Sequence, residues 1–390
     1  MTPMDLSNIP VVDAHCHPFL PEKEEGQFYR FFNLSDLDLP LEHVENTLLF
    51  RRALKEMARL LNCREDYHTI SVARESLYKQ NPALYIQTLF QEAGIQSLVL
   101  DMGFPSEDNV GYTVPIETFS KLVNVRTAQI FRIEPLISRL FRASEPFQQM
   151  LDMYTAELVK AIKDGGFCAF KSVIAYRTGL DVELVSPEEG GAAYERLRER
   201  GVLAVPLKKK DHLSAREEKT VRDFLLRTAI TEGIRLGVPF QIHTGFGDSP
   251  MDLRIANPLH LYKIIADEEL RKAKIVLVHA GYPFAEETAF LANGYPNVYL
   301  DVSEMFPHSS IGMCDKLLRL LEMAPANKIL YGSDGYRAPE LFWISATWGK
   351  KSIADALTEL VKREVIDEDY AHRMAHMILS ENAENLYRLR

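Results

Sequence analysis

Two histidines separated by one residue stand where an apolar run ends near the N-terminus, in the stretch VVDAHCHPFL. In an extended segment alternate side chains point to the same side, so His15 and His17 are placed to bind one metal ion together. Taken alone, such a pair is a weak signal, because two histidines in an ordinary turn have the same spacing. Other residues of the same chemistry must therefore decide what the pair does.

Three such residues follow apolar runs in the second half of the chain. His243 ends the run VPFQIH, His279 ends KAKIVLVH, and Asp334 lies in NKILYGSDGYR. Neutral imidazole and carboxylate groups suit Zn, Mn or Fe(II), and this ligand set does not choose among the three metals. The residues therefore predict a divalent metal site, provided that the ends of their runs lie together in the fold.

A lysine at the end of another apolar run adds a second kind of chemistry. Lys171 ends the run CAFK, where an unpaired ammonium would be costly to bury. One solution is a carbamate formed with carbon dioxide, which turns the lysine into an anionic bridge between two metal ions. The other is a lysine that reaches solvent or pairs with Glu134 or Asp334. Both interpretations are open at this point.

The segments that carry these residues alternate with amphipathic helices. Ser214 followed by Glu217 predicts a capping box at the start of one helix, Gly237 predicts its end, and VPFQIH predicts the next strand. Eight strands predicted in this way end near His15, Asp101, Glu134, Lys171, His243, His279, Asp301 and Asp334. Such an alternation predicts an α/β fold, a closed (β/α)8 TIM barrel, with a doubly wound open sheet as the alternative.

We expect a single TIM-barrel domain over residues 1–390. The gap 20–94 between the first two strands is too long for a simple crossover and has helical periodicity, clearest in LEHVENTLLFRRALKEMARLL. This helical insertion either caps the barrel mouth or packs on the barrel side or at an oligomer interface. After the last strand, residues 353–362 and 367–389 predict a barrel helix and a C-terminal helical extension.

The composition excludes several classes of protein. The net charge of -10 argues against binding to nucleic acid or to an anionic membrane surface. The chain has no apolar stretch near the roughly 20 residues of a membrane-spanning helix. Its 4 cysteines form no Cys-x-x-Cys pair, and the N-terminus shows no signal segment, so we expect reduced thiols and a cytoplasmic location. A small-molecule substrate is the expected partner, and a homo-oligomer is left open.

Together these positions resemble the amidohydrolase superfamily of metal-dependent enzymes. The pattern of that superfamily is His-x-His after strand one, Lys after strand four, His after strands five and six, and Asp after strand eight. Each of these positions is filled here, and the resemblance covers nearly the whole chain. The phrases KSVIAYRTGL, QIHTGFGD with NPLHL, and SDGY are most similar to the amidohydrolase domain of FluG- and nodulin-type proteins, the amidohydrolase-2 type.

The resemblance implies a role for each ligand candidate. One metal ion, most often Zn with Mn or Fe as alternatives, would be held by His15, His17 and Asp334. A second would be held by His243 and His279, and carbamylated Lys171 would bridge the two. In the branch that resembles aminocarboxymuconate semialdehyde decarboxylase, one metal is used and the strand-six histidine, here His279, is catalytic. That branch typically lacks the strand-four lysine, so Lys171 favours two metals.

The expected reaction is hydrolysis of a C–N bond of amide type, with Asp334 as the acid–base group. The alternative is a decarboxylase that uses a single metal. Residues that follow strands four, five and eight are candidates for binding the substrate: Tyr176, Arg177, Asp248, Arg254 and Arg337. Because arginine suits a carboxylate, the expected substrate is acidic, such as a γ-glutamyl amide or another N-acyl compound. Each arginine taken singly could instead form a surface ion pair.

Overall fold

The computed structural model describes residues 3–21, 28–35, 37, 39–106, 111–249 and 251–389. Eight strands form one sheet in chain order, from β1 to β8, with helices between them. The strands are β1 (Val11–Cys16), β2 (Ile95–Asp101), β3 (Arg126–Arg132), β4 (Phe167–Ser172), β5 (Phe240–His243), β6 (Ile275–Val278), β7 (Val298–Asp301) and β8 (Ile329–Leu330). The predicted (β/α)8 barrel is confirmed, and the open sheet is excluded.

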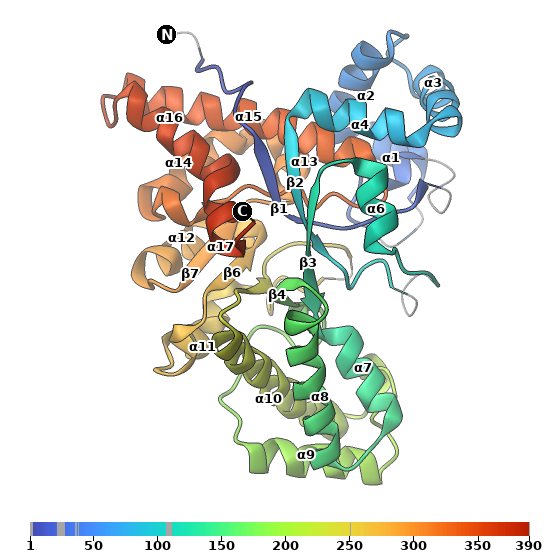
Figure 1. The fold of residues 1–390 in the computed structure, drawn as a ribbon, viewed down its shortest axis with the longest axis vertical. Coiled ribbons are helices and arrows are strands. Elements are labelled where there is room, and N and C mark those ends of the chain that lie inside the picture. Colours follow the sequence, from blue (N-terminus) through green and yellow to red (C-terminus); the bar gives the residue numbers. More distant parts are fainter. Residues whose placement is uncertain are drawn as a thin grey trace. The chain divides into compact units, whose positions relative to one another are not determined.

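The chain divides into two compact units, which are described separately. Unit 1 comprises Met1–Ala128, Gly247–Pro250 and Asp301–Arg390, and unit 2 comprises Gln129–Phe246 and Met251–Leu300. Within unit 1, β1 and β2 run parallel and side by side (Figure 1). Within unit 2, β4, β5 and β6 pair in parallel, with Lys171 opposite Gln241 and His243 opposite Val278.

The helical insertion of unit 1 is confirmed. Its helices are α1 (Leu41–Glu45), α2 (Leu48–Leu61), α3 (Tyr67–Gln80) and α4 (Pro82–Ala93). Helix α4 packs against α15 (Pro339–Lys362), the helix that follows β8. A buried ion pair joins α3 to α15, since Arg74 donates to Glu340 at 2.5 Å, and Tyr85 on α4 donates to the same carboxylate at 2.8 Å. The contacts of the described helices therefore favour packing on barrel helices over a cap.

The C-terminal helical extension is also confirmed, but its first helix begins earlier than expected. Helix α15 starts at Pro339, not at 353, because proline suits the first turn of a helix and because Trp343 and Trp348 pack into the core. The other α-helices among the described residues of unit 1 are α6 (Ile116–Val123), α13 (Met305–His308), α14 (Met313–Met323), α16 (Glu368–His376) and α17 (Asn382–Tyr387).

Unit 2 corrects three local predictions. Helix α10 (His212–Leu236) begins two residues before Ser214, because the Asp211 carboxylate caps it by accepting the Ser214 N–H at 2.8 Å. Strand β3 ends at Arg132, so Glu134 lies in the first turn of α7 (Ile133–Ala143). The sequence of residues 258–272, which opens with a proline, also predicts one helix, but that helix is broken before Asp267, whose side chain accepts from the following backbone.

The other helices of unit 2 follow the predicted alternation. They are α8 (Phe147–Lys163), α9 (Pro187–Glu199), α11 (Tyr262–Ala266) and α12 (Ala285–Gly294). Helix α9 carries the full capping box of Ser186 and Glu189, and α10 packs against both α8 and α9.

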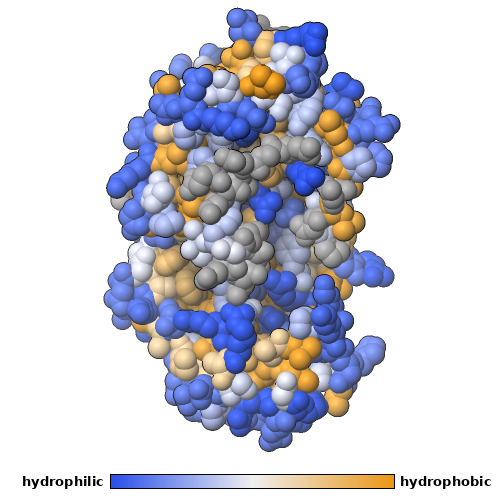
Figure 2. Space-filling model, turned by 90° about the vertical axis from the view of Figure 1, so that its right-hand side faces the viewer, coloured by the Kyte–Doolittle hydropathy of each residue, from blue (hydrophilic) through white to orange (hydrophobic). Residues whose placement is uncertain are grey.

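Hydrophilic residues make up most of the face in Figure 2, with hydrophobic residues scattered between them. Large apolar side chains that are exposed, such as Leu84, Leu213 and Phe290, come from different helices. Over the described residues, no helix combines the length and the apolar character that crossing a bilayer requires.

Candidate metal centre

The seam between β1 and the chain after β8 positions the first group of ligand candidates. Backbone bonds run from Ala14 N to Tyr331 O at 3.0 Å, from Asp334 N to His15 O at 2.9 Å, and from His17 N to Gly335 O at 2.8 Å. The pairing continues beyond the two residues of β8 itself. It therefore sets Asp334 opposite the two histidines, although Asp334 lies four residues past the strand end.

The side chains of His15, His17 and Asp334 converge. The Oδ1 atom of Asp334 lies 3.1 Å from His15 Nε2 and 3.3 Å from His17 Nε2. Both histidines are buried, whereas the Asp334 side chain is 16% exposed and so can be reached from solvent. Three such donors within 4.8 Å of one another are a ligand set for a divalent metal ion.

The hydrogen bonds of His17 show which of its ring nitrogens carries a lone pair. Its Nδ1 lies 3.3 Å from two backbone carbonyl oxygens, those of Asp101 and Phe104. A carbonyl only accepts, so Nδ1 carries a proton and the neutral ring presents a lone pair at Nε2. That lone pair faces the Asp334 carboxylate, so a cation between the two groups would stabilise them. The residues therefore fit a metal ion.

A buried polar network holds the Asp334 loop against β1. Asp13 accepts hydrogen bonds from Ser333 N at 2.9 Å and from the Ser333 hydroxyl, and the same hydroxyl oxygen accepts from Gly335 N at 2.8 Å. Burial raises the pKa of Asp13 to about 7, against the lowering effect of these hydrogen bonds. Asp13 was not among the predicted site residues, although a carboxylate within the apolar run VVDAH was a visible signal.

Unit 1 brings two more polar side chains to Asp334 that the sequence did not single out. Glu304, buried after β7, places a carboxylate oxygen within 4.8 Å of one from Asp334, and its backbone is left-handed at φ 62°. His308 lies one turn later on α13, where burial lowers its pKa to about 4 and the charge of Asp334 acts in the opposite direction. The predicted strand-end residue Asp301 instead binds the backbone and hydroxyl of Ser303.

In unit 2, His243 and His279 form the second group. His279 Nε2 lies 3.1 Å from His243 Nδ1, and both rings are buried. The backbone of His279 is left-handed, with φ 65°, and the hydroxyl of Thr244 donates to Val278 O at 2.6 Å beside it. Tyr176 packs its ring 4.5 Å from that of His243. The structure thus pairs two of the predicted ligands within this unit.

Close backbone packing positions this histidine pair. Gly245 has φ 71°, and a Cβ atom there would lie 2.3 Å from Gly281 C and from Tyr282 O. Only glycine fits, because both the conformation and the contact exclude a side chain. The chains that follow β5 and β6 are therefore pressed together just beyond His243 and His279.

Lys171 is fully buried in β4 of unit 2. In register it lies opposite Arg132 of β3 and Gln241 of β5. The neighbouring Ser172 hydroxyl donates to Glu134 Oε1 at 2.6 Å, and Val173 N donates to the same oxygen at 2.9 Å. A buried lysine at this position needs either an anionic partner or the loss of its positive charge, as the sequence indicated.

Arg177 has an unusual position for a surface arginine. It is exposed, yet the surrounding protein removes enough water to lower its pKa, with Glu134 as the largest opposing influence. Arg177 forms no ion pair within the described part of the chain. It is therefore available to bind an anionic group.

The other predicted substrate contacts differ from Arg177. Arg254 is 89% exposed and forms an ion pair with Asp252 at 2.7 Å. Arg337 of unit 1 lies over the ring of Phe104 at 5.7 Å, and Phe104 in turn contacts His17 with ring centroids 5.6 Å apart. Asp248 is half-buried, and its charge adds to the effect of burial in raising the pKa of Tyr336 within the same unit. Arg337 thus shares a neighbour with the ligands, whereas Arg254 is occupied.

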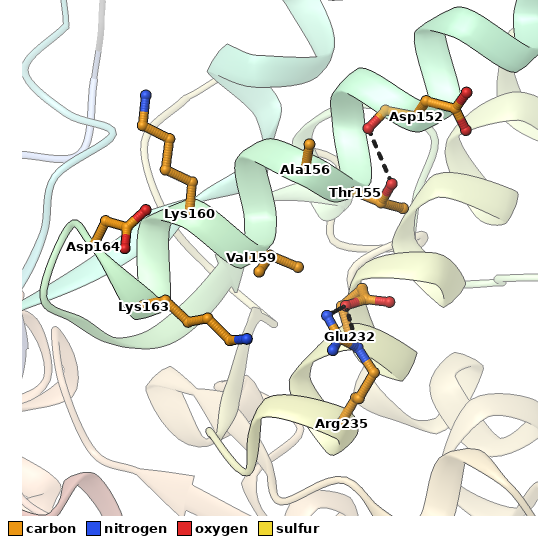
Figure 3. A pocket seen from close by; sticks show the side chains of 9 residues that line it. All are labelled: Asp152, Thr155, Ala156, Val159, Lys160, Lys163, Asp164, Glu232 and Arg235. Atoms are coloured by element: carbon orange, nitrogen blue, oxygen red, sulfur yellow. Dashed lines mark hydrogen bonds and ion pairs between the residues drawn. The ribbon is translucent and has the colours of Figure 1, made fainter.

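A surface hollow of about 590 Å³ lies elsewhere, between α8 and α10 (Figure 3). Its cations Lys160, Lys163 and Arg235 are exposed, and Arg235 is already paired with Glu232 at 2.6 Å. Both helices end just before β4 and β5 begin, so the hollow adjoins the N-terminal ends of those strands. Barrel enzymes place their chemistry at the opposite ends.

Comparison with known proteins defines the class. The model of the amidohydrolase family matches residues 152–389, which is more than half of the sequence, and this chain belongs to that family. The match includes four of the ligand candidates, Lys171, His243, His279 and Asp334, and begins after His15 and His17. Family membership and the donor set indicate an enzyme with a divalent metal.

Identity to the following individual proteins of known name or structure is 28% or lower. The chain is 28% identical to the protein fluG of Emericella nidulans over 97% of its own length and 46% of that protein, so it spans about half of this curated relative. A solved structure from Lactobacillus casei ATCC 334, described as a metal-dependent hydrolase, has TM-score 0.83, 23% identity and coverage of 98% and 96% of the two chains. Glucuronate isomerase from Caulobacter crescentus has TM-score 0.66, 14% identity and coverage of 98% and 92%. These structures share the fold.

Proposed function

We propose that the chain is a metal-dependent hydrolase that cleaves a C–N bond of amide type. The observation that carries the proposal is the convergence of His15, His17 and Asp334, in which the lone pair of His17 Nε2 faces a carboxylate oxygen at 3.3 Å. When bound there, a divalent metal ion lowers the pKa of water and polarises a substrate carbonyl. Zn is the metal we propose, with Mn and Fe as alternatives.

Asp334 is the acid–base residue in this proposal. Its side chain is reachable from solvent while the two histidines beside it are buried. As water attacks the carbonyl carbon, Asp334 takes one proton from it and gives that proton to the leaving nitrogen when the C–N bond breaks. The products are a carboxylic acid and an amine, and Asp334 ends unchanged.

We further propose a second metal ion, with His243 and His279 as ligands and carbamylated Lys171 as the bridge. Support comes from the burial of Lys171 and from its place near the C-terminal end of β4, the end at which barrel enzymes gather their catalytic groups. The Lys171 ammonium first loses a proton to give the free amine, and addition of carbon dioxide to that amine releases a second proton. A buried cation is thereby replaced with an anion. An anionic ligand complements the two neutral imidazoles, which carry no charge to balance a divalent ion.

The substrate we propose is acidic, such as a γ-glutamyl amide or another N-acyl compound with a free carboxylate. Arg177 would bind that carboxylate, because its guanidinium is exposed, recessed among protein groups and not engaged in an ion pair with described residues. Tyr176, whose ring lies on His243, would line the same part of unit 2.

The decisive experiment measures metal per chain in wild type and in Lys171→Ala, both purified with bicarbonate. The matched control is Lys272→Ala, an exposed lysine of unit 2 that pairs with Glu269. We expect nearly two ions per chain in wild type and in the control, and one or none in Lys171→Ala. One ion in all three proteins would overturn the two-metal version and favour a single-metal decarboxylase.

Activity is then tested on γ-glutamyl-p-nitroanilide and a panel of N-acyl amino acids. Release of the amine by the metal-loaded protein, and its loss after chelation, are the expected results. A fully loaded protein that releases carbon dioxide from aromatic acids and hydrolyses no amide would contradict C–N hydrolysis.

A further inference from the structure

The short helix α13 begins directly beside the metal ligand Asp334. Glu304, the residue before the helix, donates its backbone N–H to Ser333 O at 3.2 Å. The carboxylates of Glu304 and Asp334 have oxygens within 4.8 Å of each other. The backbone contact and the carboxylate contact both fix the start of α13 against the loop that carries Asp334.

His308 lies one turn further along the same helix. Its backbone N–H donates to Glu304 O at 3.2 Å, the bond of a regular helical turn. This bond closes the turn, so His308 lies one turn from the residue whose carboxylate approaches Asp334. Burial lowers the pKa of His308, and the charge of Asp334 partly opposes this by raising it, which agrees with this placement.

The His308 imidazole has no partner in the described part of the chain. It is partly exposed, and neither of its ring nitrogens forms a hydrogen bond or an ion pair with a described residue. The surrounding protein nevertheless strips it of water, because burial lowers its pKa to about 4. The ring is therefore neutral at pH 7, with one N–H donor and one acceptor available.

Packing holds α13 in place, so this imidazole is preorganised. Phe306 stacks on the buried ring of Tyr331 with centroids 5.4 Å apart. Gly349 of α15 lies under both rings, since a Cβ atom there would be 2.9 Å from Tyr331 and 3.6 Å from Phe306. The Ser309 hydroxyl donates to Met305 O at 2.9 Å at the end of the turn. A polar group on such a support keeps its geometry when a ligand binds.

We propose that His308 is a substrate-binding residue, whose imidazole hydrogen-bonds a polar atom of the ligand held at His15, His17 and Asp334. This inference rests on the proposed function, because the ligand must be bound to a metal at that site. The ligand class is a carbonyl compound, whose oxygen accepts the imidazole N–H. A neutral imidazole strengthens that hydrogen bond as negative charge develops on the oxygen, without itself losing a proton.

The test uses acetohydroxamate, a small carbonyl chelator, as the probe of the zinc-loaded full chain. Its Kd is measured by calorimetry for wild type, His308→Ala and His308→Gln, together with zinc content. His372→Ala is the control, since His372 is exposed on α16. We expect a Kd roughly tenfold weaker in His308→Ala, partial recovery in His308→Gln through its amide N–H, and no change in the control. Zinc content should be equal in all four proteins.

The outcomes separate this inference from the proposed function. Equal Kd values in wild type and in both His308 variants, with zinc retained, would overturn the role of His308 alone. A wild-type chain that retains no zinc, or retains zinc and does not bind acetohydroxamate, would contradict the proposed metal site itself. If His308→Ala does not fold, judged by its thermal transition, the comparison of His308→Gln with wild type decides the question.

Discussion

The two groups of candidate ligands differ in charge and in how they are built. In unit 1, two histidines face a carboxylate oxygen at 3.1 and 3.3 Å. In unit 2, two histidines face each other at 3.1 Å, a contact in which one ring donates and the other accepts. The first group offers negative charge and a free lone pair, whereas the second needs an added anion to hold a divalent ion firmly. A carbamylated Lys171 would therefore matter more to the group of unit 2 than to that of unit 1.

Their supports differ as well. A buried hydrogen-bond network of Asp13 and Ser333 holds the ligand loop of unit 1. Unit 2 relies instead on backbone pressed against backbone at Gly245 and Gly281. Polar support can be removed one group at a time, whereas the glycine contact tolerates no side chain at all.

The largest effect on turnover should come from Asp334, because only the group of candidate ligands in unit 1 includes a carboxylate. Asp334→Asn keeps an oxygen ligand but cannot carry a proton, so we expect kcat to fall by about 10²–10⁴-fold while most of the metal is retained. Steady-state kinetics on a hydrolysed amide, with metal analysis, measure this. The control is Asp315→Asn, which changes an exposed carboxylate of α14. Retained turnover in Asp334→Asn would remove this residue from catalysis.

A second prediction separates the two groups by their dependence on carbon dioxide. Depleting bicarbonate during reconstitution should remove the ion of unit 2 and leave that of unit 1. His243→Ala should match the depleted wild type, at about one ion per chain, and should no longer respond to bicarbonate. His17→Ala should lose the unit 1 ion in either condition. If the metal content of every protein is independent of bicarbonate, the prediction that only the ion of unit 2 needs carbon dioxide is wrong.

A third prediction uses a matched pair of arginines in unit 2. Arg177→Met should raise KM for an acidic substrate by about 10–100-fold, because a charge-assisted hydrogen bond is lost. Arg254→Met should change KM less than about twofold, since that guanidinium is 89% exposed and paired with Asp252. Equal effects of the two substitutions on KM would contradict the role of Arg177.

The smallest expected effect is a difference in pH response between the units. Burial raises the pKa of Asp223 on α10 to about 6. The folded protein then keeps this proton between about pH 4 and 6 while the unfolded chain has lost it, so the free energy of unfolding falls as pH rises. For His308 in unit 1 the pKa is lowered to about 4, so the unfolded chain holds the extra proton and stability rises with pH.

Replacing one of the two groups should remove its effect on the pH dependence of stability and leave the effect of the other. In wild type, Asp223 should lower the free energy of unfolding by up to roughly 3 kcal/mol as pH rises from about 4 to 6, and this decrease should be absent in Asp223→Asn. His308 should instead raise the free energy of unfolding as pH rises from about 4 to 6.5, and this increase should be absent in His308→Gln. Urea unfolding of the metal-free proteins at these pH values measures both slopes. Identical slopes in wild type and both variants would show that neither group titrates as described.

Much of the barrel was predictable because each strand ends in a recognisable way. Apolar runs that end in a polar residue located Lys171, His243 and His279 within a residue of the strand ends. The closing strand was the exception, since β8 has two residues and Asp334 lies four beyond it. Its position depends on backbone bonds to β1, which no local pattern reveals. Helix starts were misplaced where two capping residues compete, as at Asp211 and Ser214.

The part of the site that escaped prediction comes from residues without a strand-end signal. Glu304 and His308 lie after the predicted strand end at Asp301, and the start of α13 comes near Asp334 through the bond from Glu304 N to Ser333 O in the loop that follows β8. Asp13 was hidden within an apolar run. Arg254, by contrast, looked like a substrate contact because it follows β5, and only its bond to Asp252 shows that it is occupied.

The contacts between β1 and the chain after β8 join residues that the ribosome synthesises at very different times. Asp13 and its partner Ser333 lie 320 residues apart. At a synthesis rate of about 5–20 residues per second, the ribosome takes roughly 15 to 60 s to deliver the second after the first. The candidate ligands His15 and His17 are therefore synthesised well before Asp334, whereas unit 2 is almost continuous in sequence and is complete sooner. A cell that supplies metal to the growing chain would meet the histidine pair of unit 2 before unit 1 has its carboxylate.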